Sequence, residues 1–203
     1  MNVQRFAVII LAGGSSSRLG SPKQWLLYKG KSLLQHAIDE AITAGADQVI
    51  VVTGALQMND VDQGYVQIVR NEHWEEGMAS SIRCGIQSLE HFADVDAAII
   101  MVCDQPYADH SVLKGLLHQQ HISGKPIVAS EYGGRAGTPA LFHRSFFDRL
   151  MQLKGDIGAR YLIAEHKELA AFLDFPKGIT DIDTMRDYES ISAEKKHDDQ
   201  GRI

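Results

Sequence analysis

The most constraining feature of this sequence is a series of short apolar runs without alternation between polar and apolar residues. Turn-forming residues bound the runs on both sides. They lie at Phe6–Ala12, Val49–Val52, Val66–Val69, Ala97–Val102 and Ile127–Ala129. Strands that are covered on both faces have this pattern, because neither side of such a strand meets water. The runs therefore predict a central sheet with protein layers on both of its faces.

Segments with helical periodicity separate these runs. The clearest begins after Ser32, a good N-cap residue, carries apolar residues from Leu33 to Ile42, and stops at Gly45. A second helix is expected over Ala79–Leu89 and a third after Ser111. Alternation of strands and helices predicts an α/β fold, a three-layer α/β/α sandwich with a Rossmann-like, mainly parallel sheet. Ligands of such sheets bind at the carboxyl ends of the strands.

The pattern changes after residue 130. A glycine-rich loop is expected at Gly133–Gly137, then helical segments near Ser145–Leu153 and Ile157–Ala164, and a further strand at Ala170–Phe175. We expect this half to complete the sheet and to shape the site of a second substrate. From about Ala193 the chain is polar and charged, which predicts one domain over residues 1–192 and a frayed polar tail over 193–203.

Composition excludes several classes of protein. The 203 residues suffice for one well-packed core, and the formal net charge of −6 argues against a nucleic-acid-binding protein. The apolar run Phe6–Ala12 is too short for a membrane span. Cys84 and Cys103 suit neither a zinc pair nor a disulfide framework, so we expect a cytoplasmic protein. We also expect a monomer or weak homo-oligomer.

The first strand leads into a glycine- and serine-rich loop with two cations. The loop reads Leu11-Ala12-Gly13-Gly14-Ser15-Ser16-Ser17-Arg18, with Lys23 close behind. Glycines let backbone N–H groups converge on an anion, hydroxyl groups add donors, and the cations add charge, so the loop predicts a triphosphate site. It is not a Walker A loop. Gly30-Lys31-Ser32 matches the last three residues of that motif, but the glycine required five positions before Gly30 is Trp25. The alternative is a flexible connection with incidental charges.

Three carboxylates are candidate metal ligands. Asp104 follows the run Ala97–Val102, so it faces the same crevice as the first loop and could bind Mg²⁺. The alternative is that Asp104 is a helix-capping or turn aspartate before Pro106. Asp181 and Asp183 are spaced as on an extended segment, which would direct both to one face. One of them could be the second metal ligand, or Asp183 or Thr184 could simply cap the following helix.

With these motifs in this order, the chain resembles the molybdenum cofactor cytidylyltransferase (MocA-like) group of the nucleotidyltransferase superfamily, which is related to the guanylyltransferase of the same pathway. The resemblance covers residues 5 to about 190. It also rests on Asn71–Arg83, which contains Gly-Met-x-x-Ser, on Gly133–Phe142, and on the Gly-Asp-x-Gly-Ala-Arg run at Gly155–Arg160. It implies the nucleotide-diphospho-sugar transferase type of fold.

The resemblance also assigns roles to individual residues. It implies nucleotide binding by the first loop, base recognition near the second strand, and Asp104 as metal ligand with Asp181 or Asp183. The nucleotide-binding residues are Leu11, Ala12, Gly13, Gly14, Ser15, Ser16, Arg18, Lys23, Thr53, Gly54, Ser81 and Asp104. It implies acceptor binding around Gly137, Thr138 and Pro139. Cytidylyl members show Ala-Gly where this chain has Gly13-Gly14, the form associated with guanylyl transfer, so CTP and GTP both remain open.

The sequence therefore predicts a Mg²⁺-dependent nucleotidyltransferase. Arg18, Lys23 and Asp104 would be catalytic, and the partners would be a nucleoside triphosphate and a small phosphorylated acceptor, which the resemblance implies is molybdopterin or its molybdenum form. A molybdoenzyme or its chaperone is a further possible partner. One alternative is a nucleotidyltransferase for sugar or polyol phosphates. Another is a glycosyltransferase, because Asp181-Ile182-Asp183 resembles the metal-binding motif of those enzymes. A third is a non-catalytic nucleotide-binding maturation factor for a molybdenum hydroxylase.

Overall fold

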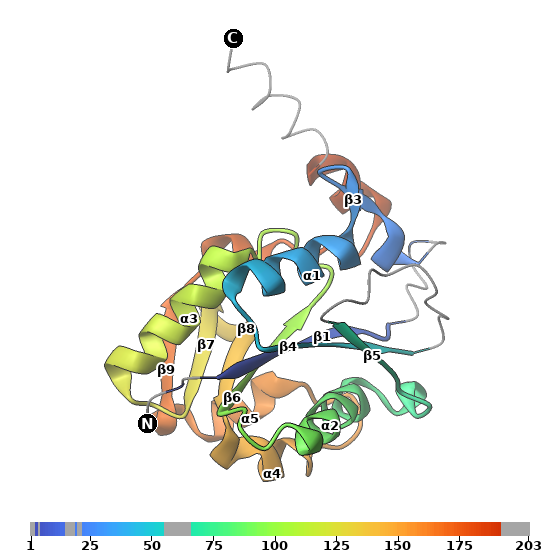
Figure 1. Cartoon of the computed structure of the whole chain (residues 1–203). Coiled ribbons are helices and arrows are strands. Elements are labelled where there is room, and N and C mark those ends of the chain that lie inside the picture. Colours follow the sequence, from blue (N-terminus) through green and yellow to red (C-terminus); the bar gives the residue numbers. More distant parts are fainter. Residues whose placement is uncertain (1–2, 4, 15–18, 20–21, 55–65, 192–203) are drawn as a thin grey trace.

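A seven-stranded sheet forms the centre of the computed structural model, which describes residues 3, 5–14, 19, 22–54 and 66–191 (Figure 1). The strand order is β5-β4-β1-β6-β8-β7-β9. These strands are β1 (Phe6–Ala12), β4 (Gln48–Thr53), β5 (Val66–Arg70), β6 (Ala97–Val102), β7 (Ile127–Tyr132), β8 (Arg135–His143) and β9 (Ala170–Asp174). All pairs are parallel except those of β8, which is antiparallel to both β6 and β7. The predicted fold class is thereby confirmed.

Helices cover both faces of this sheet. On one face lie α1 (Leu33–Ala44) and α3 (His110–Ser123), and on the other lie α2 (Met78–Ser88), α4 (Phe147–Leu150) and α5 (Ala159–Glu165) (Figure 1). As predicted, Ser32 caps α1 by accepting a hydrogen bond from the Gln35 N–H (3.1 Å), and Gly45 ends it with a left-handed backbone (φ 92°). No helix in the described part of the chain is both long and apolar enough to cross a bilayer.

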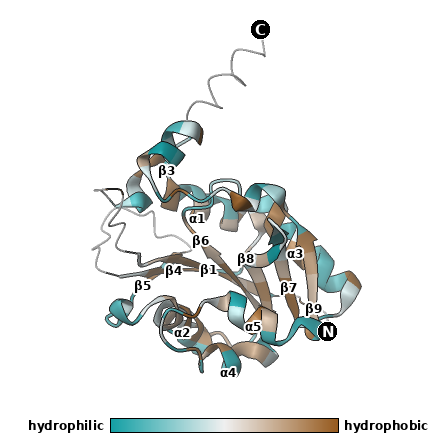
Figure 2. Cartoon of the chain, turned by 180° about the vertical axis from the view of Figure 1, so that it is seen from behind, coloured by the Kyte–Doolittle hydropathy of each residue, from teal (hydrophilic) through white to brown (hydrophobic). Residues whose placement is uncertain are grey.

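The core explains why the strand sequences do not alternate. In β1, Val8 and Ile10 pack with the α1 and α3 layer, while Ala7 and Ile9 pack with the α2 and α5 layer. Every residue of β1 is buried. In Figure 2 the strands are correspondingly brown along much of their length, and teal appears on the outward surfaces of the helices.

A smaller unit lies near the carboxyl end of β1. It consists of the hairpin of β2 (Leu27–Tyr28) and β3 (Lys31–Ser32) together with the helical residues 185–191. Leu33 and Ile182 are fully buried in its small core. The Tyr188 hydroxyl donates a hydrogen bond to the Leu27 carbonyl (2.9 Å), which joins the last described helix to the β2–β3 hairpin.

One prediction about the second half was wrong. The expected loop at Gly133–Gly137 is only a two-residue turn, because Gly133 and Gly134 both have positive φ and close a hairpin, and the chain from Arg135 onward is strand β8. Gly137 lies within that strand, and it is a glycine because a Cβ there would stand 2.2 Å from the Tyr132 hydroxyl. The tail predicted at 193–203 lies outside the described residues.

Candidate nucleotide-binding site

A cavity of about 290 Å³ opens at the carboxyl ends of β1 and β6, where the sequence places the ligand site. Six of the residues predicted to bind the nucleotide line it: Leu11, Gly13, Gly14, Lys23, Ser81 and Asp104. Ser15, Ser16 and Arg18, which were also predicted, lie outside the described residues. The cavity is therefore built by the first loop, by α2 and by the end of β6.

The glycine loop is held by a buried side chain and by close backbone packing. Gln24 donates through Nε2 to the carbonyls of Ala12 (2.7 Å) and Gly14 (3.2 Å), and only 1% of it is exposed. A Cβ on Gly54 would stand 2.5 Å from the Gly13 carbonyl oxygen, and one on Gly13 would stand 3.3 Å from Ser81 Oγ. The fold thus brings together three residues predicted at the nucleotide from β1, β4 and α2.

Thr53 differs from its predicted neighbours. It is 2% exposed, and its hydroxyl donates to the carbonyl of Val69 on the neighbouring strand β5 (3.5 Å). Its side chain therefore supports the sheet edge, and Gly54 approaches the first loop in its place.

The charged centre of the site is formed by Lys23 with two carboxylates. Lys23 Nζ donates to Asp104 Oδ2 and lies 3.2 Å from Asp183 Oδ1. Burial alone would lower the pKa of Lys23, but the charge and hydrogen bond of Asp104 and the charge of Asp183 outweigh it, so the pKa is raised. Lys23 is therefore a full positive charge where the triphosphate was predicted.

Asp104 has a further feature that bears on metal binding. Its Oδ1 is buried and has no hydrogen-bond partner among the described residues. A buried carboxylate oxygen without a donor is costly, and a divalent cation would satisfy it. The described residues contain no group of three His, Cys, Asp or Glu that would hold a metal unaided. This donor set fits Mg²⁺, which typically takes one or two carboxylates and completes its shell with water and substrate phosphate.

The segment Asp181–Asp183 is held next to Asp104. The Ile182 N–H donates to the Asp104 carbonyl (3.0 Å) and the Ile182 side chain is fully buried, so the two flanking aspartates stay at the surface of the site. Burial together with the charges of Asp104 and Asp183 raises the pKa of Asp181 to about 6. The three predicted metal-binding carboxylates are therefore neighbours.

The capping alternative for this segment falls to Thr184. Asp187 Oδ2 accepts hydrogen bonds from the N–H groups of Asp183 (3.2 Å) and Thr184 (2.8 Å), and Thr184 Oγ1 accepts one from the Asp187 N–H (3.3 Å). This is a reciprocal capping arrangement at the start of the last described helix. The Asp183 carboxylate is left to face Lys23.

The structure adds residues to the cavity that the sequence reasoning did not assign. They are Trp74, Glu75, Gly77, Met78, Val102 and Asp156. All but Val102 lie in Asn71–Arg83 and Gly155–Arg160, the two runs that carried the family resemblance. The signal was therefore present in the sequence, but no local chemistry identified which residues of those runs face the ligand.

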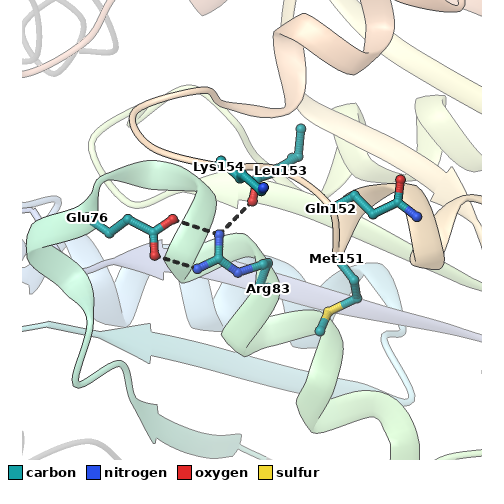
Figure 3. Close-up of a pocket in the computed structure, with 6 residues that line it drawn as sticks. All are labelled: Glu76, Arg83, Met151, Gln152, Leu153 and Lys154. Carbon is teal, nitrogen blue, oxygen red and sulfur yellow. Dashed lines mark hydrogen bonds and ion pairs between the residues drawn. The ribbon is translucent and has the colours of Figure 1, made fainter.

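Glu76 joins these two runs, because its Oε1 accepts a hydrogen bond from the Gly155 N–H (3.2 Å) while its carboxylate pairs with Arg83 of its own run. Arg83 binds both carboxylate oxygens of Glu76 (2.9 and 2.6 Å) and donates to the Leu153 carbonyl (2.6 Å), as Figure 3 shows. These contacts with Arg83 and the Gly155 N–H lower the pKa of Glu76 to about 2. The Glu76 carboxylate is therefore ionised at neutral pH, and its hydrogen bond with Gly155 holds the two runs together.

Gly77 lies where these two runs pack against each other. It has a φ of 116°, and a Cβ there would stand 2.8 Å from Asp156 Cα. The Ala79 N–H donates to the Gly155 carbonyl (3.1 Å), and the Met78 N–H donates to Asp156 Oδ1 (3.4 Å). Only a residue without a side chain allows the start of α2 to approach this loop so closely.

The predicted acceptor residues are connected to the metal candidate through Gln105. Thr138 Oγ1 donates to Gln105 Oε1 (3.4 Å), and Gln105 Nε2 donates to Tyr132 Oη (3.2 Å) and the Gly178 carbonyl (2.9 Å). The run Gly137–Pro139 does not line the 290 Å³ cavity. These residues therefore support the backbone beside Asp104 in this structure.

A sequence profile described as the MobA-like NTP transferase domain matches residues 8–169. The chain belongs to the MobA-like NTP transferase family. It is 28% identical over 151 residues to a probable molybdenum cofactor guanylyltransferase of Bacillus cereus, covering 74% of each chain. It is 26% identical over 196 residues to the purine catabolism protein PucB of Bacillus subtilis, covering 90% of this chain and 94% of that one.

Solved structures share this fold. The Mycobacterium sp. strain JC1 homologue of Rv0371c superposes with a TM-score of 0.77 at 28% identity, covering 94% of this chain and 96% of that one. Rv0371c of Mycobacterium tuberculosis itself gives 0.76 at 26% identity over 93% and 98%. Another structure of that protein, 24% identical over the same shares with a TM-score of 0.73, is a complex with manganese. The MobA-like chain is a nucleotidyltransferase, and a nucleoside triphosphate is its substrate class.

Proposed function

We propose that this enzyme transfers the nucleoside monophosphate of CTP or GTP to a phosphorylated acceptor, molybdopterin or its molybdenum form, and releases pyrophosphate in a Mg²⁺-dependent reaction in the cytoplasm. The observation that carries the proposal is the Lys23, Asp104 and Asp183 cluster beside the glycine loop, with Asp104 Oδ1 left without a donor. The name of the Bacillus cereus relative, a probable molybdenum cofactor guanylyltransferase, supports the acceptor.

The residues would act by positioning and charge. Gly13 and Gly14 would leave their backbone exposed to the triphosphate, and Lys23 would neutralise charge that builds on the phosphates as pyrophosphate leaves. Asp104 and Asp183 would hold the ion. When bound, the ion would offset charge on phosphate oxygens and orient the leaving group. An acceptor phosphate is already ionised near pH 7, so the site needs no general base.

Asp181 would contribute differently from its neighbours. Its raised pKa, about 6, means that this carboxylate binds a proton at mildly acidic pH in the metal-free protein, and a cation would have to displace that proton. We therefore assign Asp183 as the second ligand beside Asp104, because Asp183 already faces Lys23. Asp181 would add negative charge close to the ion.

The test is a product assay on purified protein. It is incubated with Mg²⁺, each of the four nucleoside triphosphates and molybdopterin, and pyrophosphate and the dinucleotide product are measured, with EDTA and Mn²⁺ as metal controls. We expect acceptor-dependent pyrophosphate with CTP or GTP. If sugar or polyol phosphates replace molybdopterin at equal or higher rates, the acceptor is wrong. If no acceptor gives a product while nucleotide binds tightly, a maturation factor is the better description.

A further inference from the structure

A second cavity, of about 520 Å³, lies between α5 and the end of the β7–β8 hairpin, and we call it the hairpin cavity. Glu131, Ala136 and Phe172 line it from three neighbouring strands. Ile163 lines it from α5, and Lys167 lines it from the short 3-10 turn Lys167–Leu169 that follows α5. The apolar side chains among these belong to, or pack against, the core on the α2 and α5 side of the sheet. The cavity therefore has an apolar floor on the same face as the nucleotide site.

The rim of the hairpin cavity is positively charged. Arg135, Arg160 and Lys167 all line it, against the one carboxylate of Glu131. None of the three cations forms an ion pair or side-chain hydrogen bond within the part of the chain that the structure describes, unlike Arg5, Lys23 and Arg83, which each bind carboxylates. Three cations around one hollow, on a chain with a net charge of −6, repel one another and favour an anion between them.

The hairpin cavity is next to the nucleotide site. Asp156 lines the nucleotide cavity and Arg160, four residues later, lines the hairpin cavity. Between them Gly158 begins α5 and packs so closely on Met78 that a Cβ would stand 2.6 Å from its sulfur. Met78 itself lines the nucleotide cavity. A ligand lying over the start of α5 could therefore reach both cavities.

We infer that the hairpin cavity binds a second anionic group of the acceptor, separate from the phosphate that reacts beside Asp104. Arginine and lysine supply the charge-assisted donors that such a group requires, and the apolar floor of Ala136, Ile163 and Phe172 suits a flat ring next to it. This inference rests on the proposed function, because it assumes an acceptor bound to this enzyme. It adds that the acceptor has two anionic ends and that α5 distinguishes it from a simple phosphate monoester.

The inference is tested with Arg160→Gln, Lys167→Gln and the double variant, using molybdopterin as acceptor. We expect the acceptor KM to rise about tenfold in each single variant and about a hundredfold in the double variant, as for loss of charge-assisted hydrogen bonds. The kcat at saturating acceptor and the Kd of the nucleotide from calorimetry should stay within about twofold. The matched control is Lys114→Gln, an exposed lysine of α3 on the opposite face of the sheet, and it should change none of these values.

A direct binding measurement separates this inference from the proposed function. Molybdopterin is titrated into wild-type protein and the double variant without nucleoside triphosphate, and its Kd is compared. Weaker binding by the double variant supports the hairpin cavity even if the wild type releases no pyrophosphate, in which case only the proposed reaction fails. Equal Kd values, or no binding by either protein, overturn the inference. An acceptor KM close to the wild-type value in Arg160→Lys, which keeps the positive charge and N–H donors at this position, would further support a binding role.

Discussion

Replacing Asp104 by asparagine tests the metal assignment most directly. Asparagine keeps the shape of the side chain and an oxygen that still accepts a hydrogen bond from Lys23, but it removes the negative charge. It also replaces one of the two carboxylate oxygens by an amide NH2 group, which donates hydrogen bonds and does not bind a metal ion. The Oδ1 atom that has no donor in this structure is the natural ligand position, so the change affects the ion before it affects packing.

The expected loss of activity follows from the role of charge in the reaction. Removing a group that stabilises charge in the transition state typically costs a factor of at least about 100 in turnover. We expect a fall of that order in Asp104→Asn, with half-maximal activity moved to a higher Mg²⁺ concentration. Nucleotide affinity measured in the absence of metal should fall much less, because Lys23 and the glycine loop remain.

The expected loss of stability follows from the exposure of the ion pair. The Asp104 and Lys23 side chains are 14% and 17% exposed, so the pair contributes more than a surface salt bridge. Lys23 keeps Asp183, 53% exposed, as a partner, so the cost is smaller than that of an isolated buried charge. We estimate that Asp104→Asn lowers the free energy of unfolding by about 1 to 2 kcal/mol, which for a chain of this size lowers the Tm by roughly 3 to 6 °C.

The assay combines thermal unfolding and Mg²⁺-dependent pyrophosphate release on the same preparation. Asp183→Asn is the matched control, since it changes a more exposed carboxylate of the same cluster and should lower Tm less. A folded Asp104→Asn protein with about 100-fold lower turnover agrees with the metal role. A strongly destabilised protein whose folded fraction turns over normally would refute it and return Asp104 to the role of a turn residue.

Three further predictions concern the nucleotide cavity and the carboxylates beside it. Lys23→Ala should weaken triphosphate binding by roughly 1 to 3 kcal/mol in calorimetry, whereas Lys154→Ala, outside this cavity, should leave it unchanged. Gly14→Ala should fold normally, because its Cβ would meet only Lys23 Cε at 4.0 Å, and should raise the ratio of kcat/KM for CTP over GTP; an unchanged ratio would mean that this position does not select the base. The raised pKa of Asp181 means that the folded metal-free protein binds an extra proton between the unfolded pKa, about 3.9, and about 6. The associated stability is present at lower pH and is lost as pH rises toward 6. It amounts to at most about 1 kcal/mol, because Asp181 is partly exposed and solvent screens its interactions. Urea unfolding in EDTA should show this slope in the wild type, and its persistence in Asp181→Asn would contradict the assignment.

Much of the architecture could be predicted because its causes are local. The run Phe6–Ala12 is a strand within the predicted bounds, and α1 begins and ends at its predicted cap residues. The first loop was recognisable because glycine, hydroxyl and cationic side chains occur together directly after a strand. These features depend on residues a few positions apart, whose preferences act in the unfolded chain as well as in the fold.

The prediction failed where a turn decided the direction of a strand. Five glycine-rich residues suggested a loop, but Gly133 and Gly134 alone close the hairpin, and Gly137 is glycine because Tyr132 occupies the space beside it. Composition could not separate these two uses of glycine. The antiparallel insertion of β8 between β6 and β7 is a consequence of that turn.

The sequence by itself indicated most of the strands and helices, predicted a phosphate-binding role for the first loop and identified the candidate carboxylates. Only the tertiary structure decided which of them meet. Lys23 and Asp183 are 160 positions apart, and Gly77 fits against Asp156 only because α2 and the loop before α5 share one face of the sheet. No periodicity or spacing encodes such contacts, because they arise when packing of the two core layers brings distant strand ends to one edge.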